Sequence, residues 1–177
     1  MDFIEETISS RDIYQGKIIN LRVDEVKLPN GTVSTREVVE HPGGVTIIPV
    51  TNKSEVLLVE QFRKPVEETL LELPAGKLEP GEEPLSSARR ELIEETGFQA
   101  GKMEYLFPFY TSPGFTDEVL HLFLARELKE VGINPDEDEI IRVHRIKKDE
   151  IIKNIKTGRI KDGKTIMGLL YFLRGDY

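Results

Sequence analysis

The stretch GKLEPGEEPLSSARRELIEETGF, residues 76–98, is the part of this 177-residue chain that decides its fold. Pro84 suits the first position of a helix, because its missing N–H would have no intrahelical partner there. Good helix formers follow, and Gly97 suits the left-handed turn at which helices commonly end. The stretch therefore predicts a helix over residues 84–96.

The predicted helix carries an acidic face beside an apolar stripe. The apolar stripe consists of Leu85, Ala88 and Leu92. The acidic face consists of Glu91, Glu94 and Glu95. A solvated acidic surface is one explanation, but like charges repel, and a hard divalent cation such as Mg²⁺ or Mn²⁺ would offset that repulsion. Arg90 stands one turn before Glu94 and would fix the orientation of its carboxylate.

A loop rich in glycine and proline precedes this helix. It contains Gly76, Pro80 and Gly81, and it follows the apolar run TLLELPA at residues 69–75. A backbone without bulky side chains can approach a ligand closely. The loop therefore favours a ligand site on the acidic helix over a merely solvated surface.

The stretch resembles the Nudix box, in which a glycine, five residues, a glutamate and seven residues precede R-E-U-x-E-E-x-G-U, with U a bulky aliphatic residue. The matching residues are Gly76, Glu82, Arg90, Glu91, Leu92, Glu94, Glu95, Gly97 and Phe98. Only Phe98 departs from the pattern, because it is aromatic. The resemblance implies hydrolysis of a nucleoside diphosphate linked to another group, with cations neutralising charge on the pyrophosphate.

The resemblance also implies roles for single residues of the box. The implied metal shell comprises Glu91, Glu95, the nearby Glu94 and the backbone carbonyl of Ala75. Glu82 would join through water or a further metal position, although a loop carboxylate stabilised by the helix dipole is the alternative. Arg90 would brace the glutamates and thereby support catalysis.

Strand-like runs interleaved with three predicted helices indicate an α/β fold with room for a proper core. Residues 29–31 predict a hairpin turn, and residues 51–54 predict another turn that joins VTIIPV to EVLLVEQF as a hairpin of a central sheet. Residues 1–11 are expected to be a polar lead-in. The Nudix resemblance implies an α/β/α sandwich around a mixed sheet in residues 44–177. It also implies a small antiparallel sheet in residues 1–43 that helps to form a homodimer.

Residues outside the box resemble the ADP-ribose pyrophosphatases, a Nudix subgroup. The fragments concerned are Arg36-Glu37, Glu60-Gln61-Phe62-Arg63 and the Ser112-Pro113-Gly114 turn. In this turn, Pro113 stands 16 residues after Gly97. The implied substrate-binding residues are Arg36, Arg63, Pro113 and Glu118. Guanidinium groups can grip phosphate and stack on a purine, although each arginine could instead form a local ion pair. Arg36 would act across the dimer interface.

The resemblance implies Mg²⁺-dependent hydrolysis of ADP-ribose to AMP and ribose 5-phosphate, with another nucleotide sugar such as GDP-mannose as the alternative. Members of the subgroup use a glutamate on a loop well after the box as the general base. The loop INPDEDE at residues 133–139 offers Glu137 as the first choice and Glu139 as the second. Both could equally be solvated loop carboxylates. His121 and His144 lie in strand-like runs and are interpreted as structural.

Composition excludes several other kinds of protein. The chain has no cysteine, which excludes disulfides, a thiol nucleophile and the cysteine-dependent chemistry of isopentenyl diphosphate isomerases. A net charge of −8 opposes binding to nucleic acid. No apolar run is long enough to span a membrane, so we expect no membrane partner and a cytoplasmic location by default. An intact acidic cluster also weighs against a non-catalytic nucleotide sensor.

Overall fold

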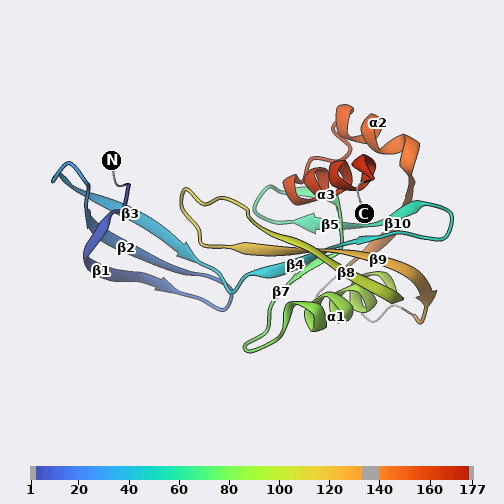
Figure 1. Ribbon diagram of the computed structural model, residues 1–177, viewed down its shortest axis with the longest axis horizontal. Coiled ribbons are helices and arrows are strands. Elements are labelled where there is room, and N and C mark those ends of the chain that lie inside the picture. Colours follow the sequence, from blue (N-terminus) through green and yellow to red (C-terminus); the bar gives the residue numbers. More distant parts are fainter. Residues whose placement is uncertain (1–2, 133–139, 176–177) are drawn as a thin grey trace. The chain divides into compact units, whose positions relative to one another are not determined.

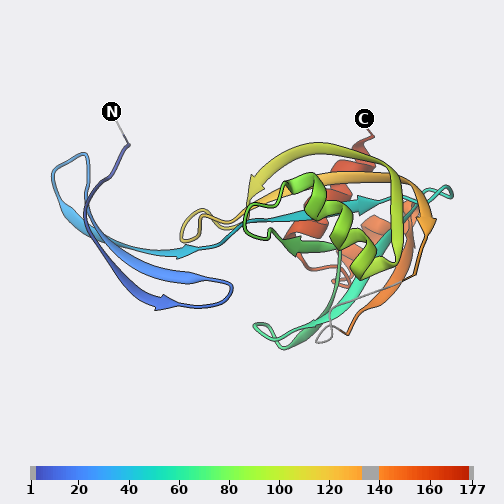
Figure 2. The same ribbon diagram turned by 90° about the horizontal axis from the view of Figure 1, so that it is seen from below.

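The computed structural model of the chain describes residues 3–132 and 140–175. These residues form two compact units. The first contains the chain up to Gly43 together with Tyr110–Leu120, and the second contains the rest from Gly44 onward. The path of the chain through each unit can be followed in Figures 1 and 2.

The first unit is built on an antiparallel sheet of three strands in the order β1-β2-β3. These strands are β1 (Glu6–Gln15), β2 (Asn20–Lys27) and β3 (Val33–Glu40). The pairing of β2 with β3 brings Lys27 opposite Val33, so the chain reverses over residues 28–32. Gly31 takes a left-handed φ of 86° in this reversal. The predicted hairpin turn is confirmed.

The expectation of a polar lead-in over residues 1–11 was wrong, because β1 begins at Glu6 and pairs with β2. All ten residues of β1 are exposed in the single chain. A strand without a buried face shows no alternation of apolar and polar residues, which is the usual signal for a strand. Its backbone hydrogen bonds to β2 define it instead.

Two sheets and the helices form the second unit. One sheet has the order β7-β4-β9-β8 and the other has the order β10-β5-β6. The strands are β4 (Gly44–Pro49), β5 (Glu55–Arg63), β6 (Glu68–Glu72), β7 (Ala75–Lys77), β8 (Phe98–Tyr110), β9 (Val119–Glu130) and β10 (Arg142–Lys147). The helices are α1 (Pro84–Thr96), α2 (Ile151–Lys156) and α3 (Gly163–Arg174), with a 3₁₀ turn over Lys148–Glu150.

Alternation along the central strands creates two apolar cores. Ile47 of β4 packs with Leu92 of α1, whereas the next residue, Ile48, packs with Leu169 of α3. Figure 1 shows α1 on one side of the strands and α2 and α3 on the other. The predicted α/β fold with an α/β/α sandwich is confirmed.

The strands β4 and β5 do not form the hairpin that the turn over residues 51–54 predicted. They belong to different sheets, and one isolated bridge between Val50 and Val56 joins their ends. Each strand is central in its own sheet, since β4 lies between β7 and β9 and β5 lies between β10 and β6. A run that is apolar on both faces shows that a strand is central but does not choose its neighbours.

Candidate active site

Local sequence fixes both ends of α1, the helix that carries the acidic face. Pro84 stands at its start, after Glu83 in extended conformation. Gly97 ends it with a left-handed φ of 74°, and the Gly97 N–H donates to the carbonyl of Ile93 at 2.8 Å. Glycine takes this φ without the strain that a Cβ would cause. The predicted helix over residues 84–96 is confirmed.

Arg90 lies at the centre of the acidic cluster. Its Nη1 donates to Glu91 Oε1 at 2.7 Å and to Glu94 Oε2 at 2.9 Å. Its Nε and Nη2 donate to the two carboxylate oxygens of Glu82 at 3.1 and 3.0 Å. The hydrogen bond with Glu82 lowers the pKa of Glu82 and contributes most to raising the pKa of Arg90. Three carboxylates thus share one guanidinium, which leaves an excess of negative charge.

Strand β7 lies directly against the acidic face of α1. The Ala75 N–H donates to Glu95 Oε2 at 3.0 Å, and Glu95 is only 2% exposed. Gly76 lies so close to Glu91 that a Cβ at this position would overlap the Glu91 carboxyl group. A side chain at the box glycine would therefore displace the Glu91 carboxyl group from its present position.

The donor chemistry of this face fits a hard divalent cation. Glu91 and Glu95 supply carboxylate oxygens beside the main chain of Ala75, and such oxygens are the ligands that Mg²⁺ prefers. Within residues 3–132 and 140–175, no three His, Cys, Asp or Glu side chains are grouped as a formed metal site. Arg90 instead links the carboxylates, and a bound cation would neutralise the charge that Arg90 leaves unbalanced.

Arg63 belongs to a second cluster in the same unit. Its Nε and Nη2 donate to the two carboxylate oxygens of Glu72 at 2.8 and 2.9 Å, and Lys164 also bonds Glu72. The local ion pair considered for Arg63 is therefore present, while its side chain remains 39% exposed. The sequence did not single out Glu72 or Lys164. The only signal was an acidic residue within the apolar run TLLELPA.

The remaining predicted substrate residues, Arg36, Pro113 and Glu118, belong to the first unit. Arg36 Nη2 donates to Glu5 at 2.5 Å. Glu118 accepts a hydrogen bond of 2.6 Å from the Thr111 hydroxyl group. Pro113 lies in a turn in which the Phe115 N–H donates to the Ser112 carbonyl at 3.1 Å. Arg36 and Glu118 thus have local polar partners, as surface residues do, and their substrate contacts stay predictions.

The two candidate bases, Glu137 and Glu139, lie outside the described residues. The histidines that we interpreted as structural have polar neighbours on adjacent strands. His144 Nε2 lies 3.1 Å from Glu60 Oε2, and His121 Nδ1 lies 3.3 Å from the hydroxyl oxygen of Tyr105. These contacts agree with a structural role.

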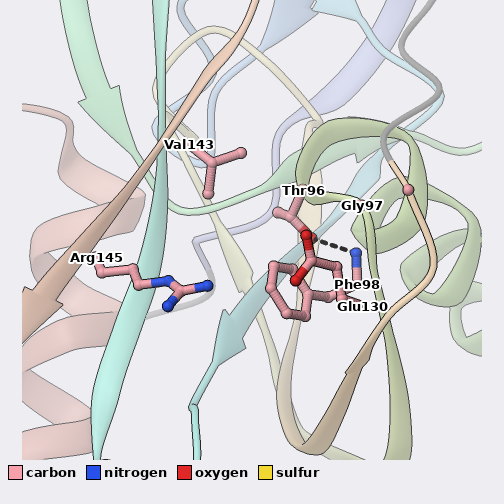
Figure 3. A pocket seen from close by; sticks show the side chains of 7 residues that line it. Thr96, Gly97, Phe98, Glu130, Val143 and Arg145 are labelled. Atoms are coloured by element: carbon pink, nitrogen blue, oxygen red, sulfur yellow. Dashed lines mark hydrogen bonds between the residues drawn. The ribbon is translucent and has the colours of Figure 1, made fainter.

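A cavity of about 300 Å³ opens where α1 ends and β8 begins. Figure 3 shows Phe98 and Glu130 on one side of it and Val143 and Arg145 of β10 on the other. The guanidinium carbon of Arg145 lies 5.8 Å from the centroid of the Phe98 ring, a cation–π distance. The Phe98 N–H donates to Thr96 Oγ1 at 3.2 Å and fixes the wall of the cavity. The aromatic departure from the box thus has a packing partner.

The fold and the acidic cluster define a class of protein that sequence comparison names. Residues 40–168 match the NUDIX domain, and residues 5–39 match the nucleoside diphosphate sugar hydrolase N-terminal domain. The chain belongs to the Nudix family, which confirms the resemblance seen in the box. Nudix hydrolases generally need a divalent metal ion.

Several curated proteins are similar over most of their length. A methanol dehydrogenase activator from Bacillus methanolicus is 47% identical over 96% of this chain and 92% of its own. An ADP-ribose pyrophosphatase from Bacillus subtilis is 47% identical over 94% of this chain and 91% of its own. A GDP-mannose pyrophosphatase from Yersinia enterocolitica is 40% identical over 80% of each chain.

A solved structure shares the fold. It is described as an ADP compounds hydrolase, and it superposes with a TM-score of 0.87 over 99% of this chain and 97% of its own, at 18% identity. Among the described residues, the structure contains no helix with the length and hydrophobicity of a membrane span.

Proposed function

We propose that this protein hydrolyses the pyrophosphate bond of ADP-ribose to AMP and ribose 5-phosphate in the presence of Mg²⁺, with Mn²⁺ as a substitute. The observation that carries the proposal is the acidic face of α1. There Glu91 adjoins Gly76, Glu95 adjoins Ala75, and the carboxylates outnumber Arg90. A solvated surface would not need the buried Glu95 or the tight approach of Gly76 to Glu91. Both features fit a metal site whose carboxylate ligands are held in place.

The proposed roles of the side chains follow from their contacts. Glu91 and Glu95 hold the metal ion, with Glu94 and Glu82 around it, and Arg90 restrains these carboxylates. When bound, the ion withdraws charge from the pyrophosphate oxygens and so eases attack of water at phosphorus. Arg63 grips a phosphate group. Glu137, or failing it Glu139, accepts the proton of the attacking water.

The choice of ADP-ribose is supported by the relatives named ADP-ribose pyrophosphatase, and GDP-mannose remains the alternative because of the relatives named GDP-mannose pyrophosphatase. The test measures release of nucleoside monophosphate from ADP-ribose, GDP-mannose, NADH and diadenosine polyphosphates with Mg²⁺. We expect the highest kcat/KM for ADP-ribose. A higher kcat/KM for GDP-mannose would make GDP-mannose the substrate in place of ADP-ribose. If none of the compounds is hydrolysed, the protein would be a nucleotide-sensing module.

A second candidate function is activation of a dehydrogenase, and the observation that favours it is the 47% identity with the methanol dehydrogenase activator. The test compares the turnover of a methanol dehydrogenase with the wild-type chain and with its Glu91→Gln variant. Stimulation that the variant loses would tie activation to the acidic cluster. Absence of stimulation would leave hydrolysis as the function.

We also propose a homodimer formed through the N-terminal sheet, in which Arg36 and Glu118 contribute to substrate binding, in a cytoplasmic protein. Support comes from the apolar residues that β1 exposes in the single chain, since Ile8 is 52%, Ile13 47% and Tyr14 57% exposed. Sedimentation should give twice the mass of the chain. The double variant Ile8→Glu and Ile13→Glu should sediment as a monomer, and an unchanged dimer would exclude β1 from the interface.

A further inference from the structure

Glu72 is a buried carboxylate that pairs with two basic side chains, Arg63 and Lys164. It is 1% exposed at the end of β6, and Arg63 takes both of its oxygens in a bidentate pair. Burial on its own would raise the pKa of Glu72, but hydrogen bonds from Arg63 and the charge of Lys164 outweigh burial and lower it. Glu72 is therefore ionised at neutral pH, and this one carboxylate pairs with both Arg63 and Lys164.

The first turn of α3 holds this carboxylate in place. Lys164 Nζ bonds Glu72 and also donates to Asp162 Oδ2 at 3.0 Å. Asp162 caps the helix by accepting from the Thr165 N–H at 2.9 Å and from the Thr165 hydroxyl at 2.6 Å. The Thr165 oxygen in turn accepts the N–H of Leu73 at 2.8 Å. Glu72 and Leu73 are thus both fixed by the first turn of α3.

The same segment leads directly into the acidic site. The carbonyl of Pro74 accepts the N–H of Ile47 at 2.9 Å, and the N–H of Ala75 donates to Glu95. The charge of Glu95 also contributes to raising the pKa of Arg63, after the larger effect of its hydrogen bond to Glu72. Arg63 and the acidic face of α1 therefore interact electrostatically, and residues 72–75 connect their two clusters along the chain.

Arg63 has one edge left for a ligand. Its Nε and Nη2 are used by Glu72, whereas Nη1 makes no hydrogen bond to any described residue. A guanidinium that is held on one edge loses little further freedom when its other edge binds a phosphate oxygen. An arginine without such support would have to be ordered by the substrate itself.

We propose that Glu72 and Lys164 are positioning residues that hold Arg63 so that its remaining edge meets the pyrophosphate of the substrate. This inference rests on the proposed function and extends it to residues that do not touch the substrate. Lys164 has a second effect, because it also pairs with Glu72 and so leaves more of the positive charge of Arg63 for an anionic substrate.

The test is a double-mutant cycle on ADP-ribose hydrolysis. Glu72→Gln and Lys164→Met should each lower kcat/KM about 10- to 100-fold, mainly through KM. In an Arg63→Met background, Glu72→Gln should lower kcat/KM less than about threefold, because its effect passes through Arg63. An equal loss in both backgrounds would overturn the proposal and make Glu72 merely structural.

Matched controls exist on β6 and just before α3. Glu68 lies on β6 with Glu72, and it pairs with Lys161 at a surface where both side chains are about half exposed. Glu68→Gln and Lys161→Met should leave kcat/KM within about twofold, because exposed pairs contribute little. If Glu72→Gln fails to fold, Lys164→Met provides the same cycle with Arg63→Met.

A binding measurement separates failure of this inference from failure of the proposed function. Inorganic pyrophosphate is titrated without metal while the ¹⁵Nε–H resonance of Arg63 is followed by NMR. In the wild type the resonance should shift as pyrophosphate binds. In Lys164→Met pyrophosphate should bind about tenfold more weakly. A wild type that hydrolyses nothing but shows this shift refutes only the proposed function, whereas absence of the shift refutes the role of Arg63 and its supports.

Discussion

Two ion-pair clusters of the second unit are built around central groups of opposite charge, Arg90 in one and Glu72 in the other. Around Arg90, one cation serves Glu82, Glu91 and Glu94. Around Glu72, one carboxylate serves Arg63 and Lys164. The first cluster is partly open to solvent and joins α1 to Glu82 of the preceding loop, and the second surrounds a carboxylate that is 1% exposed.

The opposite central charges matter because a pyrophosphate bound with a divalent metal ion brings both signs of charge to one site. The carboxylates around Arg90 suit the metal ion, and Arg63, which keeps one edge beside Glu72, suits the phosphate oxygens. The difference teaches that the charge imbalance around a central group, rather than the number of ion pairs, marks the groups that are prepared for a ligand.

The largest effect is expected when the acidic cluster loses one metal ligand. Glu91→Gln keeps the shape of the side chain but removes its charge, so kcat for ADP-ribose should fall by about a thousandfold, equivalent to about 4 kcal/mol. Steady-state release of AMP measures it, and circular dichroism checks the fold. A kcat near that of the wild type would break the division of roles between the two clusters.

A smaller loss of activity is expected when the Glu91 side chain is displaced but keeps its charge. In Gly76→Ala the new methyl group overlaps the Glu91 carboxyl group, so that side chain must move. Metal affinity should weaken about 10- to 100-fold, which a Mg²⁺ dependence of the rate would detect. Gly114→Ala is the control, since nothing lies within 4 Å of a Cβ placed there. Equal behaviour of the two variants would contradict the tight fit of Gly76.

The dependence of stability on pH tests the Arg90 cluster without any substrate. Arg90 holds the pKa of Glu82 below its ordinary value of 4.5, so this stabilisation is present above about pH 4.5 and is lost as pH falls through the lowered pKa. With chelator present at pH 7, Arg90→Met should lower Tm by about 2–4 °C. The difference in Tm from the wild type should shrink towards pH 3. A difference that is constant with pH would contradict the ionic origin.

The smallest effect is expected for a balanced pair. Arg36 and Glu5 form an exposed ion pair of one cation with one carboxylate in the first unit. Glu5→Gln should leave the urea midpoint of unfolding unchanged, because exposed ion pairs contribute little. A clear shift of the midpoint would show that charge imbalance is a poor guide to which pairs matter.

The sequence predicted best what is encoded locally. Pro84 and Gly97 delimit α1, and the box places Arg90 within one turn of the glutamates that it bonds. The pairing of Lys164 with Glu72 joins residues 92 positions apart, and no local sequence pattern predicts it. The same limit explains the wrong expectations for β1, which has no buried face, and for β4 and β5, whose neighbours come from distant segments.

The most direct test of the two-cluster account is a titration with Mn²⁺, in which free Mn²⁺ is followed by electron paramagnetic resonance without substrate. It is applied to the wild type, Glu91→Gln and Glu72→Gln. We predict that Glu91→Gln weakens Mn²⁺ binding about 10- to 100-fold, while Glu72→Gln leaves it within about twofold of the wild type. Unchanged affinity in Glu91→Gln, or equal weakening in both variants, would contradict the assignment of the cation to the Arg90 cluster.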